Sequence, residues 1–177
     1  MLRKTGPGGQ PLLVYLLLLI TVGALCVTAW ALFFREPQTH LAPDYAPVAT
    51  EKNAQPIPGD SGDRVAAEPG SGNVSLSYSN EVSVDLSSRE VSLFFANPGR
   101  SNQDMLLQIR IRDTVILQSG RITPGNQVQS LRLDEDAARM LSPGGYDGSF
   151  MIFYYDLNSG EKAMVNTEVP IRITVVE

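Results

Sequence analysis

The chain has 177 residues, of which 19% are charged, and a formal net charge of −5. This length leaves room for one ordinary domain of about 100 to 150 residues and one further segment. The acidic balance argues against nucleic acid as a partner, because phosphate binding needs clustered Lys and Arg. Three segments of unlike composition follow one another along the chain, and each is interpreted separately.

The first segment is a long apolar block. Residues 5–34 carry no charged side chain, and Leu12–Phe34 contains eight leucines. As a helix, this block would span about 34 Å, which matches a hydrocarbon core of about 30 Å. The sequence therefore predicts a transmembrane helix over residues 11–34, with the lipid bilayer as its partner.

The charges that flank the block predict its orientation. Arg3 and Lys4 precede it, whereas Arg35 is followed at once by Glu36. The positive-inside rule then places residues 1–10 in the cytoplasm and the C-terminal domain outside the cell membrane. We expect a single-pass protein with an extracytoplasmic domain.

A cleavable signal peptide is the alternative interpretation of this block. Ala29-Trp30-Ala31 has the small-x-small form of a cleavage site. The apolar region of a signal peptide, however, usually runs for only about 7 to 15 residues. The longer block favours a retained signal anchor.

The second segment, residues 35–72, is rich in proline and glycine. It holds six of the twelve prolines of the chain, and its apolar residues show no periodicity. Such a composition buries too little surface to offset the entropy of ordering. We expect a disordered linker that holds the domain away from the membrane.

The third segment, residues 73–177, has the alternating pattern of β-strands. Apolar residues recur at every second position in four stretches, and Gly, Pro, Asn and Ser cluster between them. About seven short strands in a segment of this length indicate an all-β antiparallel β-sandwich. Asp134–Met140, with acidic residues at its front, predicts a single helical turn. The four stretches are Val82–Leu86, Val91–Ala96, Leu107–Arg112 and Val169–Val176.

One local motif makes the fold prediction more specific. The stretch Leu141-Ser142-Pro143-Gly144-Gly145-Tyr146 resembles the tyrosine corner of immunoglobulin-like and fibronectin-like sandwiches, in which a Tyr hydroxyl bonds back to the chain upstream. The resemblance gives Tyr146, Leu141 and Gly144 a structural role. It implies an immunoglobulin-like β-sandwich preceded by one transmembrane helix and a disordered linker.

A longer stretch carries a second resemblance. Leu141 to Asn166, LSPGGYDGSFMIFYYDLNSGEKAMVN, is similar to a recurring type of Gram-positive single-pass membrane protein with one immunoglobulin-like or fibronectin-like extracytoplasmic domain. The resemblance implies a compartment and a fold. It implies no activity.

The chemistry of the third segment argues against catalysis. It contains no Cys and no His, so nucleophilic catalysis by Cys or by a His-activated Ser has no candidate residues. Asp134-Glu135-Asp136 is better explained as the start of a helical turn than as a calcium site, and Asp156–Glu161 as a hairpin turn. We expect a non-enzymatic domain without a cofactor or a metal.

The strand after Tyr146 carries large apolar residues at both parities. The parity of Tyr146 must face the core if the corner is present, so the other parity faces outward. An outer face normally alternates to polar residues. Either the helical turn, a neighbouring strand or Met164 covers these residues, or they form an exposed patch for a partner protein or a cell-wall polymer. The outward residues are Met151, Phe153 and Tyr155.

These expectations combine into one functional hypothesis. The sequence favours a membrane-tethered extracytoplasmic β-sandwich that acts as a non-catalytic binding or structural module at the cell surface. The alternative is an accessory subunit of an envelope secretion, conjugation or pilus-type assembly.

Overall fold

The computed structural model describes residues 10–33, 42–63 and 72–177, and within the N-terminal helix it describes the side chains of residues 14–26. The chain divides into two compact units, Met1–Thr39 and His40–Glu177. The expected cytoplasmic tail lies outside the described residues except for Gln10.

In the first unit, the described residues form the helix α1 (Gln10–Phe33), of 24 residues. It occupies the apolar block, because leucine-rich sequence without charge or an internal proline favours helix. Among the residues that the structure describes, no helix meets the length and apolarity needed to cross a membrane.

The second unit is mostly β, as the alternating pattern predicts. The four strands expected from that pattern correspond to β3, β4, β5 and β9, and the expected helical turn corresponds to α2. In chain order the elements are β1 (Gln55–Pro56), β2 (Ser77–Tyr78), β3 (Glu81–Asp85), β4 (Glu90–Asn97), β5 (Gln103–Ile111), β6 (Thr114–Gln118), β7 (Asn126–Arg132), α2 (Glu135–Met140), β8 (Gly144–Asp156) and β9 (Lys162–Val176).

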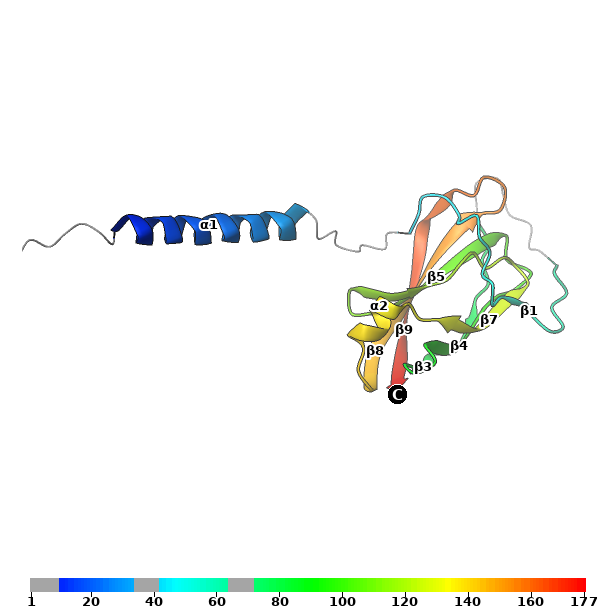
Figure 1. The fold of residues 1–177 in the computed structure, drawn as a ribbon. Coiled ribbons are helices and arrows are strands. Elements are labelled where there is room, and N and C mark those ends of the chain that lie inside the picture. The colour runs from blue at the N-terminus through cyan, green and yellow to red at the C-terminus, as the bar shows by residue number, and fades with distance from the viewer. Residues whose placement is uncertain (1–9, 34–41, 64–71) are drawn as a thin grey trace, which may run out of the picture. The chain divides into compact units, whose positions relative to one another are not determined.

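The strands form one continuous sheet in the order β1-β7-β4-β3-β9-β8-β5-β6, and β2 pairs with β4. Every neighbouring pair is antiparallel except β3 and β9, which run parallel. Figure 1 shows that the sheet curls, so that β4 and β7 lie on one side and β8 and β5 on another. The inner face of the curl therefore encloses the core.

The core forms from alternate side chains of these strands. In β3, for example, Val82 and Val84 are buried while Glu81 and Ser83 are exposed. Phe95 of β4 and Phe150 of β8 meet edge to face, with ring centroids 6.1 Å apart. Fully burying each such side chain stabilises the fold by about 1.5 to 3 kcal/mol.

The expected disordered linker is wrong for much of its length. Residues 42–63, which we call the strap, are described and belong to the compact unit that begins at His40, not at Asn73. The strap contains β1, which pairs with β7. Residues 35–41 and 64–71 of the expected linker lie outside the described residues.

Candidate functional site

The most unusual surface of the sheet is the outer side of β5 and β8. Because side chains alternate along a strand, the residues next to the core-facing ones point to this outer side. A second apolar cluster, separate from the main core, includes Leu106, Met151, Phe153 and Tyr155. We call these four residues the β5–β8 face.

Of the two alternatives for Met151, Phe153 and Tyr155, the structure shows the covered one, and the exposed patch is wrong. Their exposed fractions are 8%, 7% and 0%. Met164 does not account for this burial, because it is itself fully exposed, and the helical turn packs through Ala137 against the main core instead. The neighbouring strand β5 contributes Leu106 to the same cluster. Ala42 of the strap also packs within this cluster. The covering segment therefore comes from the region expected to be a linker.

Tyr155 joins the β5–β8 face to the strap. Its hydroxyl donates a hydrogen bond to the carbonyl oxygen of Pro43 at 3.0 Å. Burial raises the pKa of Tyr155 to about 12, and the charge of Asp44 adds to the effect. The phenol is therefore held in its neutral, donating form.

The strap next pairs with the end of the turn between β8 and β9 and with the first residue of β9. The N–H of Lys162 donates to the carbonyl of Asp44 at 2.9 Å, and the N–H of Ala46 donates to the carbonyl of Gly160 at 2.7 Å. The Lys162 ammonium also lies 3.8 Å from the Asp44 carboxylate. Two of the three groups on each side are main-chain atoms, and the strap is held as an antiparallel bridge between Tyr45 and Glu161.

Further along, the strap crosses the chain just after β6. The N–H of Glu51 donates to the carbonyl of Arg121 at 2.9 Å, and the Glu51 carboxylate accepts the N–H of Gly120 at 2.6 Å. A Cβ at Gly120 would lie only 2.9 Å from the Cα and N atoms of Glu51. Glycine is therefore required where the two backbones cross.

The C-terminal end of the strap contacts a second glycine, Gly99. The Asp60 carboxylate accepts the N–H of Gly99 at 2.6 Å and that of Gly62 at 3.0 Å. These two hydrogen bonds, the one from Gly99 first, lower the pKa of Asp60 below its ordinary value. A Cβ at Gly99 would lie 2.7 Å from the Cα of Gly62, so this contact is also close.

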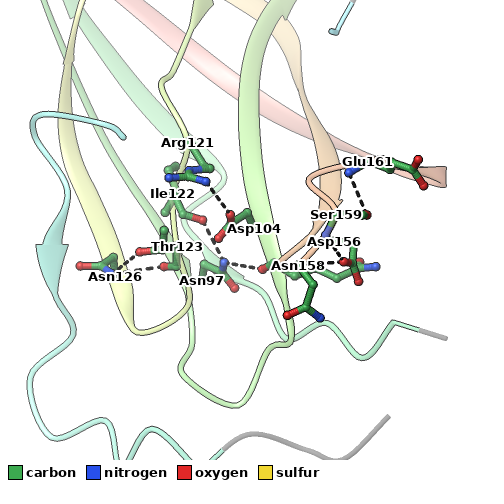
Figure 2. Close-up of polar contacts among 11 residues, drawn as sticks. Asn97, Asp104, Arg121, Ile122, Thr123, Asn126, Asp156, Asn158, Ser159 and Glu161 are labelled. Atoms are coloured by element: carbon green, nitrogen blue, oxygen red, sulfur yellow. Dashed lines mark hydrogen bonds and ion pairs between the residues drawn. The ribbon is translucent and has the colours of Figure 1, made fainter. Parts of the chain in front are cut away.

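Buried polar groups join the start of β5 to neighbouring parts of the chain (Figure 2). Asn97, which is fully buried, donates from its side-chain amide to the carbonyls of Gln103 at 2.9 Å and Ile122 at 3.0 Å. Arg121 lies 3.5 Å from the buried carboxylate of Asp104. The Asn97 amide cross-links two loops, and the Arg121 charge offsets that of Asp104.

The acidic residues weighed as calcium ligands have structural partners. The Asp156 carboxylate accepts the N–H groups of Asn158 and Ser159 at 2.9 and 2.8 Å (Figure 2). The bond from Ser159, then that from Asn158, lowers the Asp156 pKa. Among the described residues, no group of three or more His, Cys, Asp and Glu side chains is placed to hold a metal ion.

The residues of the tyrosine-corner prediction lie together at the start of β8. The Tyr146 hydroxyl donates to the carbonyl of Ser142 at 2.8 Å and accepts the Ser142 N–H at 3.3 Å. Both bonds are exposed to solvent. Leu141 and Tyr146 are half-buried against the core, and Gly144 has a φ of 151°, which favours glycine.

Sequence reasoning missed three residues of this site: Ala42, Leu106 and Gly120. Leu106 carried a usable signal, because Met105-Leu106-Leu107 is an apolar run that indicates burial on both faces of a strand. Ala42 and Gly120 carried none, since one small residue has no distinctive pattern.

Comparison with known proteins identifies no homologue and no family. No protein-family model matches the sequence, and no curated protein matches it closely enough to count as a homologue.

Proposed function

We propose that the chain is a membrane-anchored, extracytoplasmic β-sandwich that acts as a non-catalytic binding or structural module at the cell surface. One observation supports the proposal that α1 is a membrane anchor. All described side chains of α1, residues 14–26, are exposed and none is charged. A continuous apolar surface of this kind is unfavourable in water and favourable in a bilayer. Arg3 and Lys4 favour the cytoplasmic side for the N-terminus.

The strand order supports the sandwich interpretation. The strands β1, β7, β4 and β3 would form one layer, and β9, β8, β5 and β6 the other, with the parallel β3–β9 pair between them. The contact between Phe95 and Phe150 joins the two halves across the core. Two layers of antiparallel strands that pack around one core are the general plan of immunoglobulin-like sandwiches.

The use of charged groups supports a non-catalytic role. Asp60 and Asp156 accept main-chain N–H groups, and Asp104 is paired with Arg121. Each carboxylate therefore stabilises a loop. These three carboxylates hold loops and the strap in place, as expected of a scaffold that presents a surface.

Labelling of single cysteines tests the anchor and its orientation. In a Cys26→Ser background, we would introduce Val48→Cys, at a position that is 96% exposed, or Thr5→Cys in the N-terminal tail. A membrane-impermeant maleimide should label Val48→Cys in intact protoplasts and Thr5→Cys only after lysis. The reverse pattern would overturn the topology, and release of the protein by alkaline carbonate would overturn the anchor.

A further inference from the structure

The strap covers large apolar side chains with small ones. Ala42 and Ala46 are the strap residues that pack at the β5–β8 face. The only large side chain between them, Tyr45, is 62% exposed and contributes little to this cover. The apolar contact is therefore made mostly by methyl groups, whose burial stabilises the closed strap by only a modest amount.

The polar contacts of the strap at this face depend little on its sequence. Pro43, Asp44 and Ala46 all use main-chain atoms to contact Tyr155, Lys162 and Gly160. The one side-chain contact is the ion pair of Asp44 with Lys162, which is 3.8 Å long and exposed. Main-chain pairing with a sheet is one of the recurring modes by which proteins capture extended peptides.

We propose that the β5–β8 face is a binding site for an extended partner segment, and that residues 42–46 occupy it in cis. The proposal rests on the proposed function as a binding module. The partner segment carries a small apolar residue for the Ala42 position, a main-chain carbonyl that accepts from Tyr155 as that of Pro43 does, and an acidic residue for Lys162. It displaces residues 42–46 and takes over their main-chain hydrogen bonds.

A tethered strap excludes such a segment until it is displaced. A segment attached by a short linker acts at an effective concentration in the millimolar range. A free peptide at micromolar concentration therefore binds weakly while the strap is closed. Weakening the strap should raise the apparent affinity of the peptide without any change in the face itself.

The test uses the full chain in detergent micelles and a labelled peptide with the sequence of residues 41–48, LAPDYAPV. Ala42→Asp places a charge among Leu106 and Phe153 and should open the strap. Gly120→Ala should open it from a distance, through the contact with Glu51. We expect both variants to bind the peptide at least tenfold more tightly than the wild-type chain.

A charge reversal tests the register of the bound peptide. Combining Ala42→Asp with Lys162→Glu should weaken binding of the original peptide several-fold, and a peptide with lysine in place of the Asp44 equivalent should restore it. Gly145→Ala, at a glycine with no neighbour within 4 Å, should bind as the wild type does.

Two outcomes would overturn the proposal. In the first, trypsin cuts at Lys52 faster in the variants, which shows an open strap, yet the peptide does not bind. In the second, Ala42→Asp unfolds and Gly120→Ala leaves the strap closed, which makes the strap a permanent part of the core. Neither outcome affects the anchor or its orientation, which cysteine labelling decides separately.

Discussion

At the scale of single residues, Tyr155 connects parts of the chain that are far apart in sequence. Its hydroxyl reaches Pro43, 112 positions away, while its ring belongs to the β5–β8 face. One phenol therefore contributes to apolar packing and to the attachment of the strap. Its effect on stability should depend on pH.

We expect Tyr155→Phe to lower the free energy of unfolding by about 1 kcal/mol, because it leaves the Pro43 carbonyl without this donor. The Tyr155 pKa is raised from 10.0 to about 12 in the folded chain. Its contribution is therefore fully present below pH 10 and is lost as the pH rises from 10 to about 12. Urea unfolding at several pH values should show a smaller alkaline loss in Tyr155→Phe than in the wild type.

Tyr45→Phe is the matched control, because Tyr45 is a strap tyrosine that is mostly exposed. This variant should keep the alkaline loss of the wild type. Parallel stability curves for wild type and Tyr155→Phe above pH 10 would contradict the prediction.

Tyr146 has hydroxyl bonds of a different kind. Its two bonds to Ser142 are exposed, so water can replace the lost partner. We expect Tyr146→Phe to reduce the free energy of unfolding by about 0.5 kcal/mol, at the low end for a hydrogen bond. Tyr146→Ala should reduce it more, through lost packing. A loss above 2 kcal/mol in Tyr146→Phe would show that the hydroxyl has a larger role.

At the scale of elements, the strap depends on the absence of side chains where it crosses the sheet. A Cβ at Gly120 would approach main-chain atoms of the strap, and these cannot rotate away as a flexible side chain can. The strap must therefore shift as a unit when this glycine is replaced.

We expect Gly120→Ala to increase the rate of trypsin cleavage at Lys52, an exposed strap residue, at least fivefold. An open strap can adopt the extended conformation that the protease binds, whereas a closed strap is held by its hydrogen bonds. Mass spectrometry of the fragments identifies the cut. Gly145→Ala, which makes the same chemical change in open space, should leave the rate unchanged. Equal rates in the two variants would show that the strap tolerates the added methyl group.

The elements differ in how well the sequence predicts them. Strands β3, β4 and β9 bury every second residue over most of their length, and that alternation is visible in the sequence. The helical turn is visible through its acidic start. For β8, the sequence shows that both faces are apolar but not which segment covers the outer one.

The strap could not be predicted for a physical reason. It is held by main-chain hydrogen bonds, by single side-chain bonds of Glu51, Asp60 and Tyr155, by two alanines and by contacts with glycines. None of these leaves an apolar period in the sequence. Its proline and glycine content is also that of a disordered linker. The same composition forms an ordered segment here because Gly99 and Gly120 provide room and Lys162 and Gly160 provide partners.

At the scale of the whole molecule, the strap sets the boundary of the folding unit. A protein that begins at residue 40 keeps the cover of the β5–β8 face, whereas one that begins at residue 73 exposes that face. The shorter protein also lacks the carboxylate that accepts from Gly120. The two truncations should therefore differ in stability and in solubility.

We expect the protein with residues 40–177 to unfold cooperatively, and the protein with residues 73–177 to be less stable by more than 2 kcal/mol and to self-associate. The exposed side chains of Leu106, Met151 and Phe153 account for both effects. Urea unfolding and sedimentation measure them. Equal unfolding midpoints and a monomeric shorter protein would show that the strap is dispensable.

The position of the strap in the chain also has a mechanical consequence. A load applied between α1 and a partner gripped by the sheet passes first through residues 42–63. Their contacts at Gly160, Gly120 and Gly99 follow one another along the chain, so they would yield one after another before the long β8–β9 ladder bears the load. Releasing the strap would add about 70 Å of chain. In single-molecule pulling experiments, this length should appear as an early extension at low force. The strap would then lengthen before the sheet does and lower the peak force that reaches the sheet.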